Sequence, residues 1–529
     1  MFEKTINYRK LTIHTIIIVA IILLAAISLQ GGFAATNPIN NTTNGGISGA
    51  LNSSSSGDII ELDEGIYTGN NNTNMTINKN ITIQGKTKDR VILDAQGLSR
   101  IFRIDSSANV IFINLTFING LRPGSSQELG AGGAIYNYAG ESVTIINCTF
   151  NNNTANIGGG AIYNFPDSII TIKDSTFTNN NGGLVGGAIS IINSINLSFV
   201  NIQGSTFINN IADDGAALYF VSRKNGTMFI DIINSNIINN TASFRGGGIY
   251  ISTSDSNSDG SEFTLAVLNI SDSIINGNNA LISGGMFLST GNYSLTYVNV
   301  ANSTISNNSA ISDGGGIGVS ASNNATVIVN ISDSNITDNI AGNNGGGINL
   351  FSEDDNRFNY GNIIININST KINGNKAGKN GGAISSYIHN GSDGNSTIII
   401  DNSTMNNNTA DNNGGAISSN TGENSTGDST VIVSGSDLSG NSAGNDGGAV
   451  SSSTGDGSSG DSTVIIDDST INDNNAGNNG GALSSNTGEN STGNSIIIVI
   501  DSDIENNTAG NNGDTASATT GDGSSGDSE

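Results

Sequence analysis

The chain has 529 residues and a formal net charge of −27, although only 12% of its residues are charged. Nucleic acid is excluded as a partner, because phosphate binding needs clustered basic residues and here 18 Lys and Arg stand against 45 Asp and Glu. A single cysteine excludes an internal disulfide. The 71 glycines and the abundant Asn, Ser and Thr would fit a disordered chain, but regular Ile-rich runs indicate strands.

Residues 1–35 differ in composition from the rest. Three basic residues within the first ten precede an almost wholly apolar run, Leu11–Leu29, and the segment closes on Ala34 and Ala35. This order is typical of a secretory signal peptide, with cleavage expected near those alanines. An uncleaved N-terminal anchor is the alternative, because the apolar run nearly spans a bilayer. Both interpretations place the remaining chain outside the cell, secreted or at the surface, with membrane contact only through this segment.

Residues 36–130 are interpreted as an N-terminal cap and the first coils of a solenoid. Short segments here alternate apolar and polar residues in part, as half-buried strands do. They are Gly57–Gly69, Met75–Gly85, Val91–Gly97, Ile101–Ile104 and Val110–Phe117.

Residues 131–529 form a repeat array in which two phrases alternate twelve times. The first phrase is Gly-Gly-Ala-Ile or a close variant. Its last residue is assigned to Ile135, Ile162, Ile189, Leu218, Ile249, Phe287, Ile317, Ile348, Ile384, Ile417, Val450 and Leu483.

The second phrase begins with a large apolar residue, which is followed after three positions by Asn and after five by Ala or Gly. The apolar residues are Phe150, Phe177, Phe207, Ile237, Ile275, Ile305, Ile336, Ile372, Met405, Leu438, Ile471 and Ile504. The asparagines are Asn153, Asn180, Asn210, Asn240, Asn278, Asn308, Asn339, Asn375, Asn408, Asn441, Asn474 and Asn507.

Each unit reads as three short strands bounded by turns, for example Val143–Asn147, Cys148–Asn151 and Gly159–Asn164. One unit cannot bury its own Ile and Phe side chains, but stacked units can, with strands about 4.8 Å apart. No unit has an apolar period of 3.6 residues over a useful length, which argues against a helical solenoid. The predicted fold is all-β, a right-handed parallel β-helix of about 12–16 coils.

The asparagine column is expected at a turn, where each amide would hydrogen-bond to the Asn above and below it. Solvated turn residues without such bonds are the alternative. The glycine pairs are expected to supply positive φ angles or a close approach between coils.

Insertions fall between the Gly-Gly-Ala-Ile strand and the next Ile-rich strand, as in Asn420–Thr430, Ser453–Thr463 and Asn486–Ser495. Insertions in solenoids map to one face, which here is expected to be polar, acidic and flexible. The loop sequence that begins at Thr421 recurs 66 residues later, beginning at Thr487. Glu529 follows where a strand should start, which indicates either a truncated array or one without its cap.

The pairing of Phe-x-x-Asn with Gly-Gly-Ala-Ile resembles the repeats of polymorphic outer membrane proteins. The opening GDIIELDEGIYTG…ITIQG resembles right-handed β-helix surface proteins, especially the adhesin-like proteins of methanogenic archaea, and the resemblance spans roughly Ile59 to Ala516. It implies a cell-surface adhesin-like or structural scaffold that displays loops on a β-helix. Its partners would be glycans or proteins on another cell.

Pectate lyases and polygalacturonases share this fold class, so a polysaccharide lyase or glycoside hydrolase is the alternative function. Adjacent acids occur at Asp213-Asp214, Asp354-Asp355 and Asp467-Asp468, but charged turn residues usually face water. The two histidines, His14 and His389, have no evident partner for acid–base work.

The place to look for an active face is the stretch from Arg100 to Arg122, which holds Arg103, with Asp94 and Asp105. No catalytic, cofactor-binding or metal-binding residue is assigned, and the protein is expected not to be an enzyme. The one cofactor alternative is calcium, bound by Asp-Gly loops. Such binding would be weak, because these loops lack a full ligand set.

Cys148 occupies a column filled by Ser in other coils and is expected to be a spare thiol, because a nucleophile would need a basic neighbour. Asn-x-Ser/Thr sequons mark candidate glycosylation sites, although an Asn-, Ser- and Thr-rich chain also produces them by chance. They include Asn147, Asn152, Asn239, Asn402 and Asn407.

Overall fold

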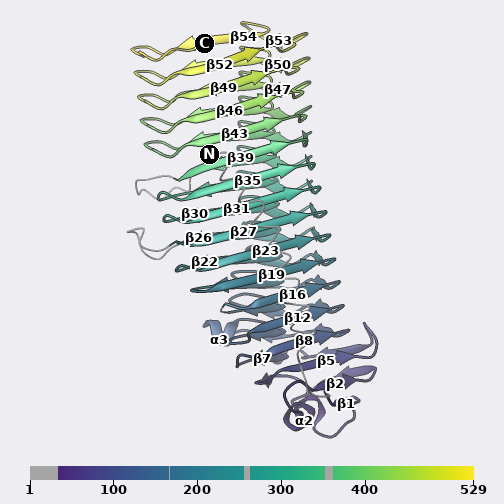
Figure 1. Ribbon diagram of the computed structural model, residues 1–529. Coiled ribbons are helices and arrows are strands. Elements are labelled where there is room, and N and C mark those ends of the chain that lie inside the picture. The colour runs from purple at the N-terminus through teal and green to yellow at the C-terminus, as the bar shows by residue number, and fades with distance from the viewer. Residues whose placement is uncertain (1–33, 166, 255–262, 352–360) are drawn as a thin grey trace.

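The computed structural model describes residues 34–529 except 166, 255–262 and 352–360, so almost all of the predicted signal segment lies outside the described residues. Figure 1 shows one long stack of coils whose strands run across the axis, with α2 at one end and the C-terminus at the other. Every paired strand is parallel to its neighbour from the next coil, which confirms the predicted all-β right-handed parallel β-helix.

Sheet A holds 16 strands and faces the viewer in Figure 1. They are β1 (Thr36–Ile39), β2 (Ile59–Leu62), β5 (Ile81–Gly85), β8 (Asn109–Ile113), β12 (Ser142–Ile146), β16 (Ile169–Lys173), β19 (Leu197–Gln203), β23 (Thr227–Ile233), β27 (Leu265–Ser271), β31 (Leu295–Ala301), β35 (Thr326–Ser332), β39 (Asn362–Asn368), β43 (Ser396–Asp401), β46 (Ser429–Ser434), β49 (Ser462–Asp467) and β52 (Ser495–Ile500).

Sheet B holds 11 strands of three or four residues. They are β3 (Gly65–Tyr67), β6 (Val91–Asp94), β9 (Thr116–Ile118), β13 (Thr149–Asn151), β17 (Thr176–Thr178), β20 (Thr206–Ile208), β24 (Asn236–Ile238), β28 (Ile274–Asn276), β32 (Thr304–Ser306), β36 (Asn335–Thr337) and β40 (Lys371–Asn373).

Sheet C holds 15 strands and contains the last residue of each Gly-Gly-Ala-Ile phrase. They are β4 (Met75–Ile77), β7 (Phe102–Ile104), β11 (Ile135–Asn137), β15 (Ile162–Asn164), β18 (Ile189–Asn193), β22 (Leu218–Arg223), β26 (Ile249–Ser254), β30 (Met286–Gly291), β34 (Ile317–Ala321), β38 (Ile348–Phe351), β42 (Ile384–Ile388), β45 (Ile417–Thr421), β48 (Val450–Ser453), β51 (Leu483–Thr487) and β54 (Ala516–Thr520).

A further short strand, which the sequence did not predict, follows the asparagine column and gives a fourth sheet, D, of 10 strands. They are β21 (Ile211–Asp214), β25 (Thr241–Arg245), β29 (Asn279–Ala280), β33 (Ser309–Ala310), β37 (Ile340–Ala341), β41 (Lys376–Ala377), β44 (Thr409–Ala410), β47 (Ser442–Ala443), β50 (Asn475–Ala476) and β53 (Thr508–Ala509). Two earlier coils contribute the pair β10 (Leu121–Arg122) and β14 (Thr154–Ala155).

The interior is filled by like residues stacked on like. Rings of Phe117, Phe150, Phe177 and Phe207 lie parallel at 4.5, 4.7 and 4.9 Å between centroids, and aliphatic side chains continue this column in later coils. In the last coils part of the interior is polar instead. There the hydroxyl of Ser419 lies 2.8 Å from that of Ser429, and the next coil repeats the pair.

The register corrects one sequence assignment. Met286 pairs with Ile249 and with Ile317, so Met286 rather than Phe287 belongs to the Gly-Gly-Ala-Ile column. Ser283, at a φ of 58°, replaces the first glycine of that phrase. Phe287 instead packs with Tyr219 and Tyr250 in a separate apolar cluster.

The asparagine column forms the predicted ladder. From Asn153 to Asn474 each side-chain Nδ2 donates to Oδ1 of the Asn in the next coil at 2.9–3.1 Å, and the amides are buried. Positive φ belongs to the residue before each ladder Asn and not to the Asn itself, for example 56° at Asn152 and 68° at Gly374. The solvated alternative is therefore wrong for this column.

Two helices were not predicted. α2 (Gly46–Ser53) begins after Gly45, lacks a side-chain cap and buries Ile47, Ala50 and Leu51 over the first coil. Lys79 Nζ donates to the carbonyl oxygens of Leu51 (3.0 Å) and Ser54 (2.8 Å), and so satisfies the helix end. The second helix, α3 (Gln127–Gly130), is a single turn against the outer face of sheet C.

Replacing Asn339 by Ala tests the ladder. Asn339 Nδ2 donates to Asn375 Oδ1 (3.0 Å) and to the Ile305 carbonyl oxygen (2.9 Å), and its Oδ1 accepts from Nδ2 and from the backbone N–H of Asn308. We expect a loss of at least about 1–3 kcal/mol in the free energy of unfolding, because buried donors lose their acceptor. Hydrogen exchange should accelerate in that coil and its neighbours.

Asn368→Ala is the matched control, since this exposed Asn ends β39 outside the ladder. It should change stability by no more than about ±0.5 kcal/mol. The loop residue Asn424 is less suitable, because its φ of 53° would strain an alanine. Equal losses at positions 339 and 368 would contradict the ladder's role.

Candidate functional site

The insertions lie on one side of the solenoid, between a sheet C strand and the next sheet A strand. Three residues, 224–226, join β22 to β23, whereas ten, 255–264, join β26 to β27. The connection from sheet A to sheet B holds two residues in every coil from β8–β9 to β39–β40. From β13 onward length variation is therefore concentrated at one corner of the coil, whereas in the coil before it α3 lies between β10 and β11.

The loops of the last coils on this face, which the sequence predicted to be flexible, are joined to neighbouring coils by hydrogen bonds. The Thr426 backbone N–H donates to the Ser392 carbonyl oxygen (2.7 Å), and buried Ser425 and Ser458 join through their hydroxyls at 3.1 Å. The backbone N–H of Asp461 donates to Asp428 Oδ1 at 3.0 Å, and that of Asn494 to Asp461 Oδ1 at 2.7 Å. These loops stack coil upon coil and present rows of acidic and amide side chains.

The arginine stretch that sequence reasoning singled out gathers around α3 at the N-terminal part of sheet C. Arg100 is only 2% exposed, and its Nη2 donates to the carbonyl oxygens of Glu128 (2.7 Å) and Ala131 (2.9 Å). Its guanidinium lies 4.6 Å from the centre of the Tyr136 ring. Burial and the charge of Arg122 lower the pKa of Arg100 to about 9, which leaves it charged at neutral pH. Arg100 thus fastens the end of α3 to sheet C.

Arg103 and Asp105, which the sequence named together as part of a candidate active face, do meet, and Arg103 also pairs with a third residue. Arg103 forms ion pairs with Asp105 and with Glu128, where Nη1 lies 2.6 Å from Oε1. Sequence reasoning missed Glu128, which lies 25 residues from Arg103 on an unpredicted helix. Asp94 belongs to a different contact, where it accepts from the Gln96 backbone N–H (2.8 Å) and Asn119 Nδ2 (2.9 Å). The cluster pairs the Arg103 guanidinium with both carboxylates, of which that of Glu128 stays exposed.

The acid pairs and His389 take part in local contacts. Asp214 pairs with Arg245 at 3.4 Å, and burial raises the pKa of Asp214 although Arg245 opposes the shift. Asp213 accepts from the Ser243 hydroxyl. Asp468 sits at a turn with φ 46°, and Asp354-Asp355 lies outside the described residues. The sequence showed no partner for His389. Its ring packs edge-on against the Tyr387 ring, with 5.8 Å between the ring centroids.

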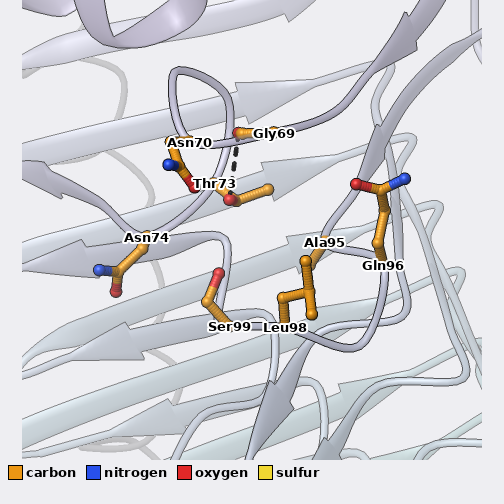
Figure 2. Close-up of a pocket in the computed structure, with 8 residues that line it drawn as sticks. All are labelled: Gly69, Asn70, Thr73, Asn74, Ala95, Gln96, Leu98 and Ser99. Carbon is orange, nitrogen blue, oxygen red and sulfur yellow. Dashed lines mark hydrogen bonds between the residues drawn. The ribbon is translucent and has the colours of Figure 1, made fainter.

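A depression of about 220 Å³ lies between the turns 69–74 and 95–99 near the N-terminal end (Figure 2). Its lining offers amides of Asn70, Asn74 and Gln96, hydroxyls of Thr73 and Ser99, and the exposed side chain of Leu98. None of these side chains is an acid or a base. The lining of the depression is polar and uncharged, and it supplies no proton-transfer group.

Metal and membrane features were sought in the same part of the chain. Within residues 34–529, leaving aside the three gaps, no group of three or more His, Cys, Asp and Glu is placed to hold a metal ion. The helices described there include none that is long and apolar enough to cross a membrane. All five named sequon asparagines, from Asn147 to Asn407, stand at corners with φ between 47° and 57°, and their glycosylation stays a prediction.

Cys148 is the first member of a second ladder. Its Sγ lies 3.3 Å from the Ile146 carbonyl oxygen, and its backbone N–H donates to Ser175 Oγ at 3.1 Å. The serines of later coils repeat both bonds, as when Ser303 Oγ donates to the Ala301 carbonyl oxygen at 2.7 Å. Burial raises the pKa of Cys148 to about 12, so the thiol stays protonated at neutral pH. Its role is packing.

Arg100→Met should loosen α3 while keeping the bulk of the side chain. We expect faster hydrogen exchange at 127–131 and a loss of about 1.5–3 kcal/mol, the usual worth of hydrogen bonds to a charged group. Arg90→Met is the control, because Arg90 is 69% exposed and makes one ion pair, at 3.3 Å, with Glu64. An unchanged exchange rate at 127–131 would mean that Arg100 does not hold the helix.

The Cys148 thiol should resist alkylation in the folded protein between about pH 7 and pH 9, because only the thiolate reacts. It should react at once when urea unfolds the chain. The thiol introduced by Ser56→Cys in a Cys148→Ser background is the positive control, since Ser56 is exposed. Equal labelling rates at the two positions would show that Cys148 is accessible.

Two segments, residues 147–164 and 402–420, match the model of the Chlamydia polymorphic membrane protein repeat. Each segment contains one ladder asparagine and one Gly-Gly-Ala-Ile phrase, which confirms the resemblance seen in the sequence. The resemblance to archaeal adhesin-like proteins stays a prediction. None of the curated proteins matches the chain.

Three solved structures are similar to part or most of the chain. The A-module of Azotobacter vinelandii mannuronan C-5 epimerase AlgE6 is 17% identical, with a TM-score of 0.37, over 68% of this chain and 87% of its own. The A-module of the epimerase AlgE4 from the same organism is 10% identical, with a TM-score of 0.25, over 89% and 92%. The PL6 family alginate lyase AlyGC is 9% identical, with a TM-score of 0.19, over 93% and 100%.

Proposed function

We propose that this protein is an adhesin-like binding scaffold of the cell surface or its surroundings, without enzymatic activity, which displays loops on a β-helix. The observation that carries the proposal is the concentration of length variation in the connections between sheets C and A, while the connection between sheets A and B holds two residues in every coil from β8–β9 to β39–β40. In solenoids the face that accepts insertions is often the binding face. The match of residues 147–164 and 402–420 to a membrane protein repeat supports a surface location.

The charge pairing around α3 supports a binding role over catalysis. A general acid or base must reach the substrate with a proton to exchange, and Arg103, Asp105 and Glu128 already pair with one another. The stacked loops of the last coils offer a rigid surface, which costs less conformational entropy on binding than a mobile loop. Glycans or proteins of another cell are the proposed partners.

Cell adhesion by the purified exported chain, residues 36–529, tests this function. Beads coated with the chain should retain cells or cell-wall material in a saturable manner. A variant in which residues 422–428 are replaced by the three-residue turn 224–226 should keep its fold and bind less. Insertion of four residues into the turn 55–57, where Ser55 and Ser56 are exposed, is the control, because it changes the chain length by the same number away from these loops. Retention no better than on beads coated with an unrelated acidic protein would refute the proposal.

Incubation with pectin and other acidic glycans, with and without calcium, separates the scaffold from a polysaccharide lyase or hydrolase. We expect no products. Release of unsaturated sugar ends, lost in Arg103→Ala or Asp105→Ala, would replace the adhesin proposal by an enzymatic one.

A further inference from the structure

The outer face of sheet A is unusual across six consecutive strands, β19, β23, β27, β31, β35 and β39 (Figure 1). Each of these strands has seven residues, and strand alternation sends its second, fourth and sixth residues into the core. The four remaining positions point outward and form four columns along the axis. We call this surface the outer stripe.

Large apolar residues fill the column of third positions. They are Phe199, Phe229, Val267, Tyr297, Ile328 and Ile364. The rings of Phe199 and Phe229 stack at 5.6 Å with 15° between their planes. Leu197, beside this column, is 48% exposed. The six residues of the column lie on the side of the sheet opposite the core, where Val267 is buried and the other five are half-buried.

Amides fill the column of fifth positions, which holds Asn201, Asp231, Asn269, Asn299, Asn330 and Asn366. Asn366, Asn330, Asn299 and Asn269 each donate from Nδ2 to the preceding member at 2.7–2.9 Å, and this chain of bonds ends on Asp231. A side-chain amide has two N–H groups and two lone pairs. Each inner member of the row thus keeps one donor and one acceptor for a ligand, held in fixed orientation.

Charge on the outer stripe is confined to Asp231, although the protein carries a net charge of −27. A basic partner would find a single carboxylate to pair with, and a polyanion would find no cation. The outer stripe is therefore complementary to an uncharged ligand. Alternating apolar faces and hydroxyl groups, which both donate and accept, are the properties of a neutral polysaccharide.

The geometry disfavours protein occupants. The backbone groups of these strands pair with strands on both sides, so no edge is open for a peptide strand. Six strands about 4.8 Å apart and seven residues long give a flat area of roughly 550 Å². A standard protein interface buries about 800 Å² per partner. A thin linear chain fits the stripe better than a second copy of the protein.

We propose that the outer stripe binds a neutral polysaccharide lying along the solenoid axis. Its sugar rings pack their C–H groups against the outward edges of the Phe199 and Phe229 rings, which stack on each other, and against Tyr297, so that apolar surface is buried on binding. Its hydroxyls pair with the amide row. This inference rests on the binding role proposed above and names a ligand class and a surface for it.

Affinity electrophoresis and calorimetry of residues 36–529 test the inference, with hydroxyethylcellulose and mannan as neutral probes and alginate as the acidic one. The unmodified chain should bind a neutral probe, and raising the salt concentration should leave the affinity unchanged, since no ion pairs form. The double variant Phe229→Ala/Tyr297→Ala should bind at least about tenfold more weakly, because aromatic anchors dominate such contacts. Asn299→Ala should also weaken binding, through the amide row.

Ile432→Ala is the control, since Ile432 also points outward from sheet A but lies beyond the stripe, on β46. It should bind as the unmodified chain does, and circular dichroism should show that all variants are folded. Three results overturn the inference. They are no binding of either neutral probe, equal binding by stripe variants and control, and a dimer that only the stripe variants lose. Cell adhesion that persists alongside any of them leaves the adhesin proposal standing, whereas loss of adhesion with intact glycan binding refutes that proposal alone.

Discussion

The stacked asparagines from Asn153 to Asn507 lie where their amides cannot reach water, so each must find its partners in the neighbouring coils. Each Oδ1 accepts the side-chain and the backbone N–H of the Asn one coil away, as Asn308 and Asn339 illustrate. A coil that slipped by one residue would break these bonds and turn its apolar residues outward. The ladder therefore fixes the register of every coil at the turn between sheets B and D, and residues can be inserted only at a distance from it.

The other features of the coil adapt to that constraint. The residue before each ladder Asn must turn the chain sharply, and Asn, Asp or Gly at positive φ does so. The Gly pair then brings adjacent coils so close that a Cβ on Gly160 would lie 2.2 Å from the carbonyl oxygen of Gly187. The first glycine of the pair is required for its positive φ and the second for the close contact between coils, which explains why the two residues recur together. The connection between sheets C and A escapes both requirements, and its length varies accordingly.

Repetition made the columns predictable and left their exceptions hidden. Twelve copies of one pattern revealed the ladder and the core residues, because each copy is independent support for the same position. Phe287 was assigned to the column in place of Met286, because Ser283 replaces the first glycine of that phrase and a single copy cannot show its own register. Sheet D was missed since two-residue strands carry no period, and α2 because glycines at 46 and 49 hide a helix that is stabilised by burial of Ile47 and Leu51.

The candidate sites were also predictable from the sequence only in part. Arg100, Arg103 and Asp105 were grouped because they lie close together along the chain, but the role of Arg100 depends on carbonyl groups at α3, which only the fold brings near. Loop order was equally hidden, because Ser- and Gly-rich segments resemble flexible linkers until their hydroxyls meet across coils.

Strand alternation has a consequence that extends beyond the core. The same period that buries Ile230 and Ile232 in β23 places Phe229 and Asp231 outside, so a solenoid must specify two surfaces with one strand. Burial in the core accounts for the inner surface but does not dictate which residues stand outside. In β46 the outer positions hold Thr430, Ile432 and Ser434, and this coil stacks as well as that of β23, so neither aromatic rings nor an amide row is needed outside to build a coil. The aromatic and amide columns of β19 to β39 are thus extra to folding, and a ligand that contacts both columns at once gives them a common purpose.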